Sequence, residues 1–175
     1  MKSGFIILLA ILWLGIVMAV LKWQQSSMLI EFDPELQLLS DLASLEQELL
    51  PYHAQHRLTT IHITADDCIC DFTSRQHRHS VAQLAEQQGF HNVFINLAES
   101  GTESIATVLP ALPAVAVFEN GELTYFGPYS SGIYCSAGNG LVEPWLTRET
   151  DSAAFSMPDT VIPYDAEGCY CRPTK

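Results

Sequence analysis

The chain has 175 residues, 48% of them hydrophobic, which is enough for one domain with a buried core and some additional chain. This length and composition exclude an intrinsically disordered protein and a multidomain enzyme. Lys and Arg number 8 against 20 Asp and Glu, a formal net charge of -12, so nucleic-acid phosphates would repel the chain and nucleic-acid binding is excluded.

An apolar segment near the N-terminus predicts a membrane anchor. Residues 4–21 contain no charged side chain, and as a helix they would reach ~27 Å, close to the hydrocarbon thickness of a bilayer. A cleaved signal peptide is the alternative, but its apolar part is normally shorter and ends in an A-x-A-like site, which is not found here. We therefore expect one retained transmembrane helix.

The charges on either side of this segment predict its orientation. Lys2 precedes it and every acidic residue follows it, whereas Lys22 alone argues for the opposite orientation. The positive-inside rule then favours a short cytoplasmic tip and an exported domain. In a bacterium the protein would sit in the inner membrane as a single-pass protein, with its C-terminal domain in the oxidising periplasm.

The first elements after the anchor are predicted as a helix and a strand. Asp33-Pro34 is a helix-start signature, with Asp33 as the cap and Pro34 at the first helical position, and leucines at helical spacing extend the helix to about residue 50. Residues 58–64 are rich in β-branched types and alternate, which predicts a strand that ends just before Cys68.

The middle of the chain predicts alternating helices and strands that end in a hairpin. We expect a helix over 74–88, a strand over 91–97 and a short helix over 102–109. Residues 114–118 and 123–126 flank Asn120-Gly121, a strong hairpin signal.

A modest helix over 141–148 and an irregular tail complete the chain. The order predicts an α/β fold with a mixed sheet flanked by helices, to which residues 28–32 can add a weak first strand. We divide the chain into an anchor (1–27), an α/β domain (28–150) and a cysteine-containing tail (151–175).

The position of the cysteines in this order resembles the thioredoxin-like fold over residues 28–150. Cys68 directly follows a strand, and the segment A-L-P-A-V-A-V-F-E-N-G-E-L is similar to the family's proline, short strand and turn. The resemblance implies that Pro113 is a cis-proline facing the redox cysteines, beside a backbone edge where an extended substrate peptide can pair. The chain also resembles a group of small membrane-anchored proteobacterial proteins with this domain, for which the resemblance implies no established reaction.

The cysteine motif departs from that family. The family has Cys-x-x-Cys after a Trp, whereas this chain has Cys68-Ile69-Cys70 between aspartates and without that Trp. Cysteines one residue apart close only a small, strained disulfide ring, which favours exchange. We expect Cys68 to attack as a thiolate and Cys70 to resolve, with Cys68, Cys70 and Pro113 as the catalytic residues; an inert or open pair is the alternative.

Five cysteines cannot all pair within one chain. Cys169 and Cys171 repeat the spacing of the first pair, either as a second dithiol that exchanges with it or as two of four thiolates around zinc or another soft metal. A copper site would instead combine His77 or His79 with the first pair. Cys135, Cys169 and Cys171 are therefore accessory redox candidates.

The sequence thus predicts a membrane-tethered periplasmic protein that exchanges disulfides with protein or peptide thiols and with a redox partner protein. No organic cofactor is implied. The alternatives are a thioredoxin-like protein that binds copper or zinc, and a thioredoxin-like binding module without catalysis. The sequence leaves the direction of electron transfer open.

Overall fold

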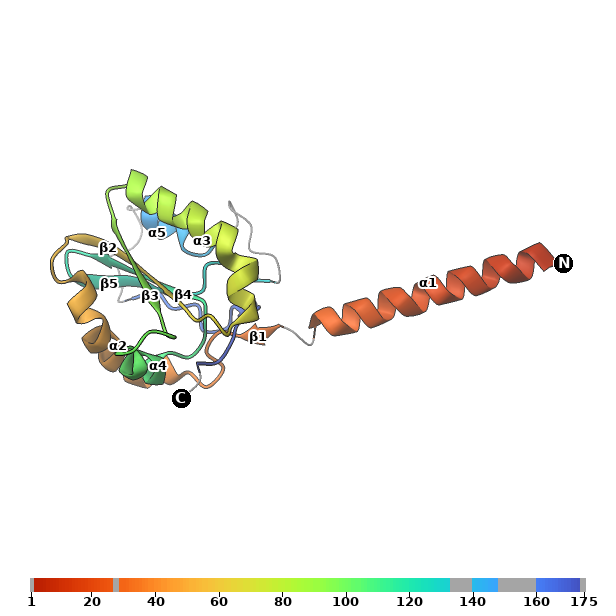
Figure 1. Cartoon of the computed structure of the whole chain (residues 1–175), viewed down its shortest axis with the longest axis horizontal. Coiled ribbons are helices and arrows are strands. Elements are labelled where there is room, and N and C mark those ends of the chain that lie inside the picture. The colour runs from red at the N-terminus through yellow and green to blue at the C-terminus, as the bar shows by residue number, and fades with distance from the viewer. Residues whose placement is uncertain (1, 27–28, 133–139, 148–159, 174–175) are drawn as a thin grey trace.

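The computed structural model describes residues 2–26, 29–132, 140–147 and 160–173, which form an N-terminal helix and an α/β domain (Figure 1). The elements, in chain order, are α1 (Lys2–Ser26), β1 (Ile30–Glu31), α2 (Gln37–His53), β2 (Leu58–Thr64), α3 (Ile69–Gln87), β3 (His91–Asn96), α4 (Glu103–Val108), β4 (Ala114–Glu119), β5 (Glu122–Gly127), α5 (Glu143–Thr147) and β6 (Glu167–Gly168).

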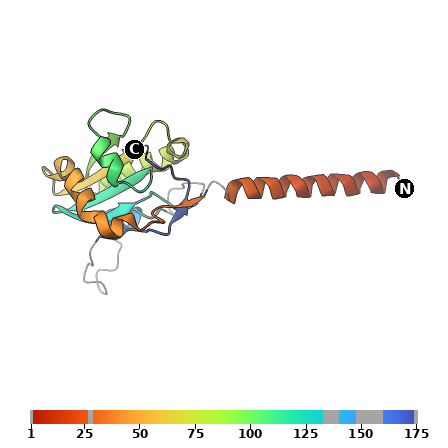
Figure 2. The same cartoon turned by 90° about the horizontal axis from the view of Figure 1, so that it is seen from below.

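Four strands form a mixed sheet in the order β3-β2-β4-β5. Strand β2 pairs in parallel with β3 and antiparallel with β4, and β4 pairs antiparallel with β5. Helices α2 and α4 cover one face, and α3 and α5 cover the other (Figures 1 and 2). The predicted α/β class with a mixed sheet between helices is confirmed, and this arrangement is compatible with a thioredoxin-like fold.

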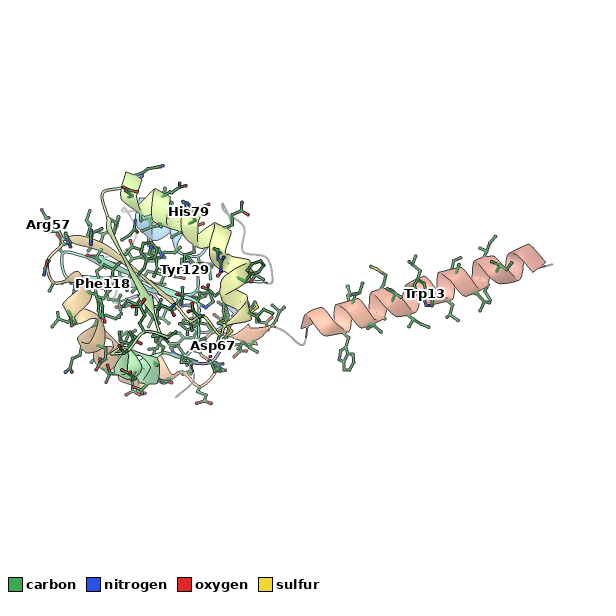
Figure 3. All side chains as sticks on the ribbon, in the orientation of Figure 1. Trp13, Arg57, Asp67, His79, Phe118 and Tyr129 are labelled. Carbon is green, nitrogen blue, oxygen red and sulfur yellow. A yellow bond between two sulfur atoms is a disulfide. The ribbon has the colours of Figure 1, made fainter. Side chains whose placement is uncertain are left out.

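The N-terminal helix has the length and composition to cross a membrane. Its window Ile6–Trp23 has a mean hydropathy of 2.5, and none of that window is buried by the rest of the protein. Figure 3 shows Trp13 on this helix, clear of the domain. Helix α1 can therefore serve as a membrane anchor, as the apolar segment predicts.

Helix α2 begins later than the sequence predicts. The N-cap residue is Leu36 and not Asp33, but the Asp33 carboxylate still caps the first turn, since its Oδ1 and Oδ2 accept hydrogen bonds from the backbone N–H groups of Gln37 (3.0 Å) and Leu38 (2.9 Å). The intervening residues form a turn in which Leu36 has a positive φ of 52°, so Pro34 is not the first helical residue. The helix also continues through Pro51 to His53, past the predicted end near residue 50.

The hairpin signal is confirmed, with bounds of β4 and β5 one residue longer on each side of the turn. Asn120 and Gly121 have φ values of 55° and 87°, the left-handed conformations that a type I′ turn requires. Helix α3 begins at Ile69 instead of residue 74, which places both Cys68 and Cys70 at its N-terminus.

The weak first strand lies outside the main sheet. Strand β1 pairs antiparallel with β6 from the tail, with Ile30 opposite Gly168. The described part of the tail, residues 160–173, is otherwise irregular, as predicted. This pairing returns the end of the chain to the start of the domain, beside the N-terminus of α3.

Candidate functional site

The junction between β2 and α3 positions the first two cysteines. A turn follows β2, in which the Cys68 N–H donates to the Ala65 carbonyl (3.1 Å), and Cys68 is the N-cap residue of α3. Cys70 lies in the first helical turn. Both side chains are buried, with exposed fractions of 3% and 5%. A helix N-terminus favours a thiolate over a thiol, because unpaired backbone N–H groups and the helix dipole stabilise negative charge there.

The two tail cysteines bond to this helix start. Cys68 forms a disulfide with Cys171, and Cys70 forms one with Cys169, with Cα–Cα distances of 5.8 and 5.4 Å. The second bond therefore lies inside the loop that the first one closes. The tail crosses the start of α3 with its chain direction reversed, so that the two Cys-x-Cys segments are matched sulfur to sulfur.

This connectivity corrects the expected pairing within Cys68-Ile69-Cys70. In the structure, neither of these cysteines is bonded to the other, and neither is free, so the small ring is not formed. The alternatives of an inert bridge between these two cysteines and of two free thiols are not formed either, because both cysteines bond to the tail. The tail cysteines Cys169 and Cys171 are instead bonded to the first two cysteines, which fits the hypothesis that the tail is a second dithiol that exchanges with the first.

The segment before Pro113 lies beside the Cys68–Cys171 bond. The Leu112–Pro113 peptide bond is cis, as the resemblance implies. The Leu112 N–H donates to the Cys171 carbonyl (2.9 Å), and the Cys171 N–H donates to the Leu112 carbonyl (2.8 Å). Cys68 Sγ lies 3.9 Å from that same Leu112 oxygen. One short antiparallel pairing thus holds the tail against the edge next to the cis-proline.

A cleft of about 350 Å³ opens at this disulfide. Its lining includes Cys68, Leu112 and Cys171, together with Asp66 and Asp67. Both aspartates are exposed, and Figure 3 shows Asp67 near the start of α3. Cys171 is partly exposed, whereas Cys68 is buried, so Cys171 is the more accessible residue of this disulfide.

Arg172, the next tail residue, is held by backbone carbonyls. Its Nη1 donates to the carbonyl oxygens of Phe32 (3.0 Å) and Pro110 (2.6 Å), and its Nη2 donates to that of Glu31 (3.3 Å). The sequence analysis did not single out this arginine. The only signal for it was its place directly after the second Cys-x-Cys segment.

Two arginines of α3, one to two turns after the cysteines, contact neighbours on their own helix. Arg78 forms an ion pair with Asp71, and the Arg75 guanidinium lies 5.5 Å from the centre of the Phe72 ring. The Phe72 side chain is 70% exposed. The cations of α3 therefore pair with neighbours on their own helix, and Asp71 is neutralised locally.

Three of the sulfurs form a compact group. The Sγ atoms of Cys68, Cys70 and Cys171 lie within 4.8 Å of one another, and the group contains no histidine among the described residues. His77 instead points into the domain, where its Nε2 is 2.6 Å from Glu143 Oε1. His79 is exposed on α3 (Figure 3). The geometry is compatible with redox chemistry or with a thiolate metal site, and it does not gather the histidines proposed for copper.

Cys135, the third accessory redox candidate, lies outside the described residues.

A known family matches most of the chain. Residues 38–173 match a family described as a domain of unknown function, DUF6436. The chain belongs to this family. The DUF6436 match begins in α2 and ends at Pro173, so it includes all four bonded cysteines and both sides of the cleft, and leaves out α1. No curated protein matches the chain.

Proposed function

We propose that this DUF6436 protein is a membrane-tethered thiol-disulfide exchange protein of thioredoxin-like architecture, and that Cys68–Cys171 is the bond it exchanges. One observation carries the proposal: this disulfide lies on the wall of a cleft, at a helix N-terminus, against the residue that precedes a cis-proline. Such a place combines access for a partner thiol with stabilisation of the leaving thiolate.

The exchange balances with a partner dithiol as the only co-reactant. One partner thiolate attacks the Sγ of Cys171, the more exposed of the two residues, and a mixed disulfide forms while the bond to Cys68 breaks. Cys68 leaves as a thiolate at the start of α3. The second partner thiolate then attacks the mixed disulfide and releases Cys171. The partner becomes a disulfide, and Cys68 and Cys171 become thiols.

Reduction of a partner disulfide uses the other mixed disulfide: Cys68 attacks one partner sulfur as a thiolate while the second partner sulfur leaves as a thiolate, and Cys171 then attacks Cys68 Sγ and releases the first partner sulfur. Cys70 Sγ lies within 4.8 Å of both, so a Cys68 or Cys171 thiolate of the open pair can attack Cys70 Sγ, form a new disulfide with it and release Cys169 as a thiolate. Pro113 keeps the Leu112 edge beside the reacting sulfurs. The periplasmic side of an inner membrane suits this chemistry, because disulfides persist there.

Cysteine variants test the exchange role. We expect Cys68→Ser to abolish disulfide exchange with reduced and oxidised insulin, because Cys171 then has no partner cysteine with which to form the cleft disulfide. Cys171→Ser should instead trap a mixed disulfide on Cys68, detected by mass spectrometry. The paired variant Cys70→Ser/Cys169→Ser is the matched control and should retain exchange. Exchange that survives Cys68→Ser at the natural rate would refute the proposal.

A thiolate metal site is the second candidate, favoured by the compact group of three sulfurs. A tetrahedral zinc site with Zn–S bonds of about 2.3 Å places its sulfurs roughly 3.8 Å apart, which small shifts of the reduced cysteines would give. Zinc alone, titrated into fully reduced protein with a competing chromophoric chelator, should bind with 1:1 stoichiometry if this candidate holds. Binding no stronger than that of the Cys169→Ser/Cys171→Ser variant excludes it.

A further inference from the structure

We propose that the tail segment at Cys171 and Arg172 fills a binding site for an extended peptide in which arginine directly follows cysteine, and that partner segments of this kind take its place when Cys68–Cys171 opens. This inference rests on the proposed exchange function and names the class of substrate that the cleft accepts. The structure supports it through three features of the tail and its surroundings.

The first feature is the backbone pairing. Leu112 and Cys171 exchange both of their hydrogen bonds, at 2.9 and 2.8 Å, as opposite residues of an antiparallel pair. This pairing uses main-chain groups alone, so any extended segment can make it. It also places the cysteine of that segment against Cys68, since the bonded sulfurs belong to residues that the Leu112 edge holds in register.

The second feature is the set of carbonyls around Arg172. Glu31 and Phe32 come from the end of β1, and Pro110 comes from the loop after α4, so two separate segments of the domain aim three acceptors at one guanidinium. Arginine fits such a set because its planar head carries donors in several directions, whereas glutamine is uncharged and shorter. The site therefore selects the residue after the cysteine.

The third feature is charge. Asp66 and Asp67 are exposed on the same cleft, in a chain with a formal net charge of -12. A negative cleft attracts cationic segments and repels acidic ones before contact is made. The tail itself follows this rule, because it brings a cation to the cleft.

The tail can be displaced in steps. Opening Cys68–Cys171 frees residue 171, while Cys70–Cys169 still keeps the tail close. What then holds the segment is the single backbone pair and the Arg172 contacts, and an external Cys-Arg segment makes the same interactions. The tail thus acts as a tethered competitor for its own substrate site.

The test uses the full chain with Cys68 as its only cysteine, made by Cys70→Ser, Cys135→Ser, Cys169→Ser and Cys171→Ser, with and without Arg172→Gln. The probes are the blocked peptides Tyr-Cys-Arg-Pro and Tyr-Cys-Gln-Pro, each activated as a mixed disulfide with thionitrobenzoate. Release of thionitrobenzoate reports the rate at which Cys68 attacks. Arg75→Gln is the matched control, since Arg75 lies on α3 over Phe72 and away from the carbonyls.

With Arg172→Gln, we expect the arginine peptide to react about tenfold faster than the glutamine peptide, the size of one charge-assisted hydrogen bond. With Arg172 present, the preference for the arginine peptide should shrink several-fold, because Arg172 of the tail occupies the carbonyl oxygens. Arg75→Gln should change neither rate. Equal rates for the two peptides in the Arg172→Gln chain overturn the inference but leave exchange intact. If Cys68 reacts neither with the two peptides nor with free dithiobis(nitrobenzoate), the proposed function itself fails.

A second measurement covers the case in which the single-cysteine chain does not fold. In the otherwise natural chain, Arg172→Gln should speed the opening of Cys68–Cys171 by a small thiol several-fold, because the tail loses its anchor beside the bond. Arg75→Gln should leave the rate unchanged. An opening rate that Arg172→Gln does not raise contradicts the role of the carbonyl site.

Discussion

His62 is a buried side chain whose two ring nitrogens both have partners. Nε2 lies 3.0 Å from Asn92 Oδ1, and because Asn92 Nδ2 donates to the Ala82 carbonyl, Nε2 is the protonated nitrogen. Nδ1 then accepts from the Tyr129 hydroxyl at 2.7 Å. Figure 3 shows Tyr129 inside the domain. A neutral imidazole satisfies this arrangement, and burial lowers the pKa of His62 to about 4.

This histidine predicts a pH-dependent stability. The folded state holds His62 neutral down to about pH 4, whereas the unfolded chain protonates it below about pH 6.5, so the free energy of unfolding falls as the pH drops through that window. The contribution of His62 is roughly 3 kcal/mol. Denaturant titrations at pH 7 and pH 4.5 should show a smaller drop for His62→Gln than for the natural chain.

The exposed His79 provides the control, since His79→Gln should retain the full drop. Parallel pH profiles for the natural chain and His62→Gln would show that the imidazole is not held neutral by the fold. His53 is also buried, and burial lowers its pKa too, so some acid sensitivity should remain in the variant.

At this scale the sequence predicts which cysteines matter and does not predict how they pair. Spacing along the chain identifies Cys68, Cys70, Cys169 and Cys171 as two similar segments, but several pairings satisfy that spacing. The bonds depend on where the tail crosses the domain, which is set by contacts about a hundred residues away in sequence. Arg172 was missed for the same reason, since its carbonyl partners come from distant segments.

At the scale of elements, the tail and helix α3 are joined twice. The bonds span 103 and 99 residues, and one is nested in the other. With either bond closed, the other closes only a small ring through the two Cys-x-Cys segments. Either bond alone is therefore enough to close the loop of about a hundred residues between α3 and the tail. One bond can open for exchange while the other preserves the fold.

This nesting predicts non-additive stabilities. Removing Cys70–Cys169 by paired alanine substitution should lower the free energy of unfolding by about 2 kcal/mol, and removing Cys68–Cys171 as well should lower it by a further 4 to 5 kcal/mol, because only then does the unfolded chain gain the entropy of the open large loop. Denaturant unfolding of the natural chain and of these two variants measures both steps. If the two steps lowered the free energy of unfolding equally, the two bonds would not share the closure of one large loop.

The elements themselves were largely predictable where the signal is local. Strand β2 and the Asn120-Gly121 hairpin follow from β-branched alternation and turn chemistry, which act between near neighbours. Helix α2 was misplaced by three residues because Asp33 caps it across a turn that the sequence pattern does not encode. The partner of β1 was not predictable, since β6 lies at the other end of the chain.

For the whole molecule, helix α1 is the feature that determines whether the protein lies at a membrane. None of its window Ile6–Trp23 is buried inside the described structure. Exposed over a full helix, its apolar side chains are unfavourable in water and favourable in a bilayer. The acidic domain and the apolar helix thus require different environments, which a membrane surface provides.

The anchor predicts a specific fractionation result. In a bacterial host the full chain should stay with membranes after alkaline carbonate washing, and the double variant Leu12→Arg/Ile16→Arg should move to the soluble fraction, since each arginine at a helix centre costs about 3 kcal/mol of insertion. Leu39→Arg, at an exposed position of α2, is the matched control and should stay membrane-bound. Extraction of the natural chain by carbonate would exclude a spanning helix.

Strand β1 starts four residues beyond Ser26, where α1 ends, and its first residue pairs with Gly168, the neighbour of Cys169. Four extended residues bridge at most about 14 Å. With α1 in a bilayer, this short connection keeps β1, and with it the sulfurs beside the paired Gly168, close to the lipid headgroups. A partner cysteine carried high on a soluble domain cannot meet them unless that domain descends to the surface, whereas a cysteine just outside another membrane helix already stands at their level.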